Sequence, residues 1–200
     1  MSKEVDHLET TEDQETATEE ATAEETPPQP PPELRVAGLF GDIDEKKAEE
    51  LIYAMLLLSN EGPEDIDLIL SSVGGSALEM FAIYDVMRFL REKMDISTTG
   101  IGKVMSAAVI LLASGTKGKR RCGRHCRLMI HAVISGTQGS LHDLRTEMGE
   151  VEYTQDKYIS VLAQETDLTE EQIREIFSKN VNTYLSAEEA LEYGIIDEIV

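Results

Sequence analysis

Short apolar segments alternate along this chain with longer segments whose apolar residues recur every three or four positions. The short segments have the pattern of buried strands and lie at residues 35–40, 66–70, 96–99, 119–122, 127–131 and 195–200. Helical spacing is found at residues 44–59, 80–90, 105–113, 141–164, 169–178 and 186–193. Strands that alternate with helices predict an α/β fold with parallel strand pairing. In open sheets of this class, ligands bind in the crevice beyond the carboxyl ends of the strands.

Two of the predicted helices carry a start signal. Thr169 with Gln172, and Ser186 with Glu189, have the spacing of a capping box, in which each side chain satisfies a backbone N–H of the other residue. The helix at residues 80–90 has a continuous apolar face that we expect to be buried. This face consists of Met80, Ile83, Tyr84, Met87 and Leu90.

Acidic residues are distributed unevenly between two parts of the chain. The 200 residues include 39 acidic and 18 basic side chains, which gives a formal net charge of −21. Residues 1–33 hold 11 of the acidic residues, one basic residue and five of the six prolines. This stretch has too little apolar surface to offset its chain entropy, so we expect a disordered tail, either a solubilising segment or a docking arm. Residues 34–200 are predicted to form one domain.

The composition excludes several classes of function. A charge this negative disfavours nucleic acid as a partner, because phosphate binding requires clustered Lys and Arg. No apolar run approaches the roughly 20 residues that span a bilayer, and the N-terminus lacks a secretory signal pattern, so we expect no membrane association and a cytoplasmic location. Cys122, His125 and Cys126 offer three ligands from one turn, whereas a closed zinc site needs four, so we expect no metal.

Gly74 and Gly75 lie between a predicted buried strand and an apolar helix. Backbone without Cβ atoms can turn sharply there and present N–H groups to an anion, as in an oxyanion hole. The simpler interpretation is a strand-to-helix turn with no chemical role. A nucleotide-binding loop is disfavoured, because the Gly-x-x-x-x-Gly-Lys-Ser/Thr pattern is absent.

Ser106 and His131 are candidates for nucleophilic chemistry. Ser106 begins an apolar helix and is followed by Ala107, whose N–H could stabilise an oxyanion near the positive end of the helix dipole. The alternative is that Ser106 is an ordinary N-cap. His131 ends an apolar strand, where it could serve as a general base or could pack as a core residue.

These candidates belong to a series of seven short motifs between residues 35 and 200. The series comprises Ser71-Ser-Val-Gly-Gly-Ser76, Ala82-Ile-Tyr-Asp85, Gly102-Lys-Val-Met-Ser106-Ala-Ala, Gly115-Thr-Lys-Gly-Lys-Arg120, Met129-Ile-His131, Tyr184-Leu-Ser-Ala-Glu-Glu-Ala190 and Tyr193-Gly-Ile-Ile-Asp197. Each motif is modest, but their order and spacing together resemble the proteolytic subunits of the Clp protease family.

The resemblance implies a fold, an assembly and a reaction. The fold would be a crotonase-like ββα superhelix, with the helix at residues 141–164 protruding as a handle that joins two rings. The assembly would be a homo-oligomer of heptameric rings, stacked as a tetradecamer around a closed chamber. The reaction would be serine endopeptidase cleavage of unfolded polypeptides without a cofactor, with a possible AAA+ unfoldase of the ClpX or ClpA type as partner.

The resemblance also implies roles for individual residues. Ser106 would be the nucleophile and His131 the general base. The backbone N–H groups of Gly75, with Gly74 beside it, and of Ala107 would form the oxyanion hole.

The third catalytic residue departs from the family pattern. The family has an Asp shortly before its Leu-Ser-Ala motif, and this register falls on Asn182 here, preceded by Val181 where Arg is common. A neutral Asn can still accept a hydrogen bond from His131, but in a serine protease the change from Asp to Asn lowers kcat by roughly 10⁴. The N-terminal loop that is typical of the family also has no counterpart here, because the acidic tail occupies that part of the chain.

Two alternatives remain open at this point. The substitution at Asn182 suggests a weakly active or inactive ring subunit that partners an active paralogue. The related crotonase fold also supports acyl-CoA hydratases and isomerases, which use paired N–H groups on a thioester. That chemistry would leave the pair of Ser106 and His131 unexplained.

Overall fold

The computed structural model describes residues 35–179 and 181–200. The predicted acidic tail, residues 1–33, lies outside the described residues, and its disorder stays a prediction. No helix in the described part is long and apolar enough to cross a membrane.

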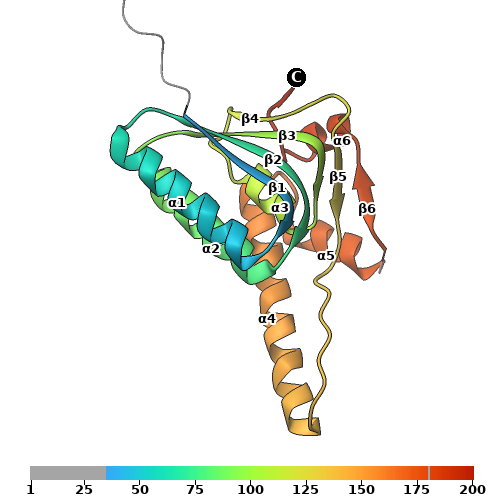
Figure 1. Ribbon diagram of the computed structural model, residues 1–200. Helices are drawn as coiled ribbons and strands as arrows, with labels where there is room; N and C mark the ends of the chain where they lie inside the picture. The colour runs from blue at the N-terminus through green and yellow to red at the C-terminus, as the bar shows by residue number, and fades with distance from the viewer. Residues whose placement is uncertain (1–34, 180) are drawn as a thin grey trace, which may run out of the picture. The chain divides into compact units, whose positions relative to one another are not determined.

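The described strands form one mixed sheet with mostly parallel pairing (Figure 1). Their order is β1-β2-β3-β4-β7, and β5 pairs with both β3 and β6. All the pairs are parallel except β5 with β6, which is antiparallel. The strands are β1 Val36–Ile43, β2 Ile66–Gly75, β3 Ile96–Met105, β4 Arg120–Cys122, β5 Arg127–Ile130, β6 Thr183–Leu185 and β7 Glu198–Ile199. The predicted α/β class with parallel pairing is confirmed.

Helices follow the strands as the sequence pattern predicts. They are α1 Glu45–Glu61, α2 Ala77–Leu90, α3 Ala107–Ala113, α4 Leu141–Glu165, α5 Glu170–Ser178 and α6 Ala187–Glu192. The capping boxes predicted from Thr169 and Ser186 are both present at the starts of α5 and α6. Local hydrogen-bonding chemistry therefore defines where these helices begin.

The main differences from the sequence prediction concern four strands. β2 continues through Gly74 and Gly75, because both residues still pair with β1. β3 likewise continues to Met105, since its last residues pair with β5 rather than with β4. The third difference is β6, which the sequence pattern did not indicate because three residues are too few to show a period. The final strand is also shorter than predicted, with only Glu198–Ile199 extended.

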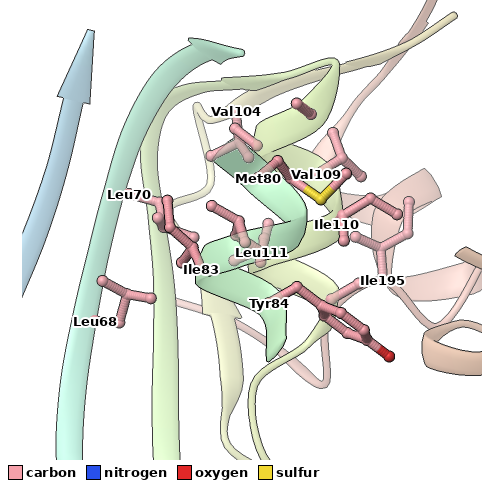
Figure 2. Close-up of a cluster of buried hydrophobic side chains, with 14 of the residues drawn as sticks. Leu68, Leu70, Met80, Ile83, Tyr84, Val104, Val109, Ile110, Leu111 and Ile195 are labelled. Atoms are coloured by element: carbon pink, nitrogen blue, oxygen red, sulfur yellow. The ribbon is translucent and has the colours of Figure 1, made fainter. Parts of the chain in front are cut away.

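The core surrounds α3, and every residue of this helix is buried. Figure 2 shows side chains of α2 and α3 packed together beside Leu68 and Leu70 of β2. A helix that is apolar on all sides is stable only when it is enclosed. The predicted apolar face of α2 is buried in full. The body of α3, which follows directly after half-buried Ser106, is consequently held in place by the core.

The helix α4 extends away from the sheet (Figure 1). Residues 141–150, its first ten residues, are all exposed, and its buried residues begin only at Tyr158. Only the C-terminal part of α4 therefore packs on the core, against α3 and α5. A protruding helix in this position agrees with the handle that the resemblance implies.

Candidate active site

Ser106 lies at the junction of β3 and α3 in an unusual backbone conformation. Its φ of 54° and ψ of −128° make it the one non-glycine residue with positive φ in the part of the chain that the structure describes. Such a conformation costs about 1–3 kcal/mol and persists only where the surroundings impose it. Ser106 occupies the N-cap position, but its side chain makes no capping hydrogen bond. The hydroxyl is therefore free for another partner.

That partner is His131, which follows directly after β5. The parallel pairing of β3 with β5 aligns Met105 with Met129, and the N–H of Ser106 donates to the carbonyl of Met129 at 2.7 Å. This register brings the Oγ atom of Ser106 to 2.8 Å from Nε2 of half-buried His131. A hydroxyl within hydrogen-bond distance of an imidazole is the arrangement of an activated nucleophile.

Gly74 lies against Ser106 with a φ of 90°. A Cβ added to Gly74 would stand 2.7 Å from both the carbonyl oxygen of Met105 and the Cβ of Ser106. The N–H of Gly74 already donates to the buried Oγ of Ser72 at 3.0 Å. Gly74 thus permits the close approach of β2 to the serine, while its own N–H is occupied within the protein.

Gly75 is the next residue along β2 and faces the same cavity. A Cβ on Gly75 would stand 2.3 Å from the carbonyl oxygen of Ile43, so no side chain fits there. Gly75 and Ala107 both line the cavity that contains Ser106 and His131. Two chain segments that are free of bulky side chains therefore border the serine.

The cavity beside Ser106 has a volume of about 300 Å³. Beside Ser106 and His131, its lining comprises Gly75, Ser76 and six more apolar or aromatic residues, namely Ala77, Ala107, Ala132, Val133, Ile134 and Tyr158. Ile134 is 79% exposed at the rim, on the irregular segment that follows His131. A pocket of this kind can bury an apolar side chain next to the Oγ of Ser106.

Asn182 lies on the other side of His131. The antiparallel register of β5 with β6 pairs Ile130 with Thr183, which places Asn182 opposite His131 one residue further on. Both residues line a smaller cavity of about 120 Å³ together with Val181. Among the described residues, no hydrogen bond joins the side chain of Asn182 to the imidazole. The fold therefore places Asn182 near His131, with no hydrogen bond between the two side chains.

Tyr158 is a site residue that the sequence reasoning missed. Its buried hydroxyl donates to the backbone carbonyl of Ser106 at 3.1 Å, and its ring lines the main cavity. Burial raises the pKa of Tyr158 far above its ordinary value, so the hydroxyl stays protonated. The signal was present in the helical spacing of Tyr158, Ile159 and Leu162, but the mostly polar character of α4 obscured it.

No group of three or more His, Cys, Asp or Glu side chains is arranged for a metal ion within residues 35–179 and 181–200. Cys122 and Cys126 are free, buried thiols.

Comparison with known proteins identifies the family. The model of the Clp protease family, described as "Clp protease", matches residues 33–200. The chain belongs to the Clp protease family. It is 38% identical over 169 residues to the ATP-dependent Clp protease proteolytic subunit 1 of Corynebacterium glutamicum, covering 84% of this chain and 79% of the relative. It is 36% identical over 167 residues to the protein of the same name from Gloeobacter violaceus, covering 83% of each chain.

Membership of the Clp protease family confirms the resemblance that the seven motifs carried. The parallel sheet with its covering helices and protruding α4 agrees with the fold expected of this family. Proteolysis is accordingly the reaction class of the chain. Neither the family match nor the relatives favour an acyl-CoA hydratase or isomerase.

Proposed function

We propose that this Clp protease family member is a serine-type endopeptidase with Ser106 as its nucleophile and His131 as its general base. The observation that carries the proposal is the 2.8 Å distance between Oγ of Ser106 and Nε2 of His131. The apolar cavity beside Ser106 supports it, because a substrate side chain held there would bring the adjacent peptide carbonyl within reach of the hydroxyl.

In the first step, Oγ of Ser106 attacks the carbonyl carbon of the scissile peptide bond. His131 takes the hydroxyl proton at Nε2, and the carbonyl oxygen becomes an oxyanion. When the tetrahedral intermediate collapses, the C–N bond breaks and His131 passes the proton to the leaving amine. A water molecule then hydrolyses the ester on Ser106 by the same route, with His131 again taking the proton.

The oxyanion is stabilised by backbone N–H groups that border the cavity. Gly75 and Ala107 supply these donors, and Gly74 contributes by its lack of a side chain, since its own N–H donates to Ser72. Donors that are fixed before the reaction are worth more than flexible ones, because no reorganisation is needed when the charge develops.

Asn182 completes the site by orienting His131. A side-chain amide oxygen can accept the Nδ1–H of the imidazole, as in Cys-His-Asn enzymes. The strand register that sets Asn182 opposite His131 supports this role. Both side chains line the same small cavity, which keeps the amide close to the imidazole.

The proposed enzyme acts as an assembly. The names of the relatives, ATP-dependent Clp protease proteolytic subunits, support an oligomer and an ATPase partner. We infer heptameric rings stacked as a tetradecamer, cytoplasmic, that cleave unfolded polypeptides supplied by an AAA+ unfoldase of the ClpX or ClpA type. The exposed apolar side chains of Leu141, Leu144 and Met148 on α4 support burial of this helix in an oligomer.

A peptidase assay tests the proposal. Purified full-length protein is incubated with a fluorogenic peptide that has an apolar residue before the scissile bond, and is separately labelled with a fluorophosphonate. We expect Ser106→Ala to abolish both cleavage and labelling, while Ser178→Ala, a change at an exposed serine on α5, leaves both intact. Mass photometry checks that each variant forms particles of the same mass as the wild type. Cleavage that survives Ser106→Ala in assembled particles would contradict the proposal.

A further inference from the structure

Tyr158 connects the core-packed end of α4 to the backbone of Ser106. Its ring is buried and lies against Phe177 of α5, with 5.8 Å between the ring centroids. Its hydroxyl reaches the carbonyl oxygen of Ser106 at 3.1 Å. The same carbonyl also accepts the N–H of Val109 at 3.0 Å, in the first turn of α3. Both lone pairs of this oxygen are thereby used.

The carbonyl of Ser106 and the N–H of Ala107 belong to one peptide unit. A peptide unit is planar, and in the trans form its C=O and N–H point in opposite directions. Any group that holds the carbonyl oxygen of Ser106 therefore also sets the direction of the Ala107 N–H. A hydrogen bond accepted by the carbonyl additionally polarises the N–H of the same unit.

The backbone of Ser106 needs such support. Its φ of 54° combined with a ψ of −128° is unfavourable for a residue with a side chain, and rotation of the peptide unit between Ser106 and Ala107 would change ψ and relieve that strain. The N–H of Ser106 is held by Met129 of β5, but this bond fixes only the preceding peptide unit. Tyr158 fixes the unit that follows.

We propose that Tyr158 is a positioning residue, whose hydroxyl holds the peptide unit between Ser106 and Ala107 so that the Ala107 N–H points at the developing oxyanion. The inference rests on the proposed function and adds to it a residue from the protruding helix α4. Tyr158 acts through Ala107 and does not itself exchange protons with the substrate, because its hydroxyl is engaged by the Ser106 carbonyl.

The test is the Tyr158→Phe variant, which removes the hydroxyl and keeps the ring that packs on Phe177. Kinetics are measured on the same fluorogenic peptide, with kcat expressed per serine that reacts with the fluorophosphonate. Complete loss of an oxyanion donor lowers kcat by about 10²–10³, and a donor that is only misdirected should lower it by about tenfold. We expect KM to change by less than about twofold, because the loss occurs only in the transition state.

Inhibition by a peptide aldehyde gives a second measurement. Its inhibition constant would not change if Tyr158 had only a structural role. The O–H of Ser106 adds across the aldehyde C=O to form a hemiacetal, whose oxygen occupies the oxyanion position. The inhibition constant of the aldehyde should therefore rise by the same factor by which kcat/KM falls. Tyr153→Phe is the matched control, because Tyr153 lies on the same helix with 60% of its surface exposed. It should change neither constant.

Each outcome decides the matter. An unchanged kcat in Tyr158→Phe, or a rise in KM alone, would overturn the inference, since the tyrosine would then only line the substrate cavity. An equal loss in Tyr153→Phe would overturn it as well. If wild-type protein is not labelled at Ser106, the proposed function fails and the inference fails with it. If wild type is labelled and Tyr158→Phe behaves as wild type, the inference alone fails.

Discussion

Gly74 and Ser106 lie so close together that a Cβ on Gly74 would stand 2.7 Å from the Cβ of Ser106. The same added atom would stand 3.1 Å from the backbone nitrogen of Ala107. The end of β2 therefore rests directly on the start of α3, with no side chain between them. This contact sets the distance between the two segments that border the candidate catalytic serine.

The first prediction concerns this contact. Gly74→Ala should lower kcat by at least about 100-fold, because the new methyl group displaces Ser106 and Ala107, whose alignment the reaction requires. It should also lower the free energy of unfolding by about 1–3 kcal/mol through overpacking and backbone strain. Kinetics on the fluorogenic peptide and urea unfolding measure both effects.

The control for Gly74→Ala is Gly118→Ala. Gly118 also has a positive φ, +86°, but a Cβ there would meet no atom within 4 Å. This variant carries the backbone strain without the collision, so it should lose stability and keep its kcat. Equal losses of kcat in the two variants would show that the contact between Gly74 and Ser106 is unimportant.

The second prediction concerns Asn182. Asn182→Asp should raise kcat, because a carboxylate holds the imidazole in the correct tautomer and stabilises its charged form better than an amide does. The increase could reach about 10⁴, the loss known for the reverse change in a serine protease. Ser178→Asp adds the same charge at an exposed side chain on α5, outside the cavities beside His131, and should leave kcat unchanged. Unchanged or lower turnover in Asn182→Asp would exclude Asn182 as the residue that orients His131.

The third prediction concerns the ion pair between buried Arg120 and Asp197. Arg120 donates to Asp197 at 2.5 Å and to the carbonyls of Glu165 and Gly194 at 2.8 and 2.7 Å. Burial alone would raise the pKa of Asp197, but hydrogen bonds from the Arg120 guanidinium and from the backbone N–H groups of Arg120 and Gly118 outweigh it and lower that pKa. The carboxylate is thus favoured in the folded state.

A lowered pKa in the folded protein makes this contribution depend on pH. The stabilisation is fully present above the pKa of an unfolded Asp, about 3.9, and is lost as the pH falls through the lower folded value. Asp197→Asn should reduce the free energy of unfolding by about 3 kcal/mol at pH 7. In this variant the free energy of unfolding should also decrease less steeply as the pH falls. Unfolding at one protein concentration between pH 3 and pH 7 measures both effects.

The control for Asp197→Asn is Asp156→Asn. Asp156 pairs with Arg174 on the surface, where both side chains are about half exposed or more. This change should cost less than about 1 kcal/mol at any pH. A similar cost for the two variants would mean that the pair of buried Arg120 and half-buried Asp197 contributes no more than a surface pair.

The fourth prediction concerns residues 1–33, which carry a net charge of −10 from 11 acidic residues and one basic residue. In the proposed ring assembly, several such segments would repel acidic peptides. Removal of residues 1–33 should therefore speed cleavage of an acidic peptide relative to a basic one at low salt. The difference should shrink above about 0.1 M salt, where the Debye length falls to about 10 Å. Identical salt dependence with and without these residues would contradict an electrostatic role.

The sequence alone determined the features that depend on neighbouring residues. The capping boxes at Thr169 and Ser186 and the apolar face of α2 were predictable because helices repeat every 3.6 residues and begin with a short-range hydrogen bond. Ser106 and His131 were recognised as candidates from the motifs around them. The α/β class followed from the alternation of the two periods along the chain.

Only the tertiary structure decided how the candidates meet. The pairing of β3 with β5 brings Ser106 to His131, which lies 25 residues away in the chain, and β6, too short to be seen in the sequence, places Asn182 opposite. The N–H of Gly74 is taken by Ser72, and Tyr158 reaches Ser106 from a helix that looked polar. These relationships depend on strand register and on packing between distant segments. Neither strand register nor packing between distant segments produces a periodic pattern in the local sequence. Both arise only when the sheet and its helices assemble around α3.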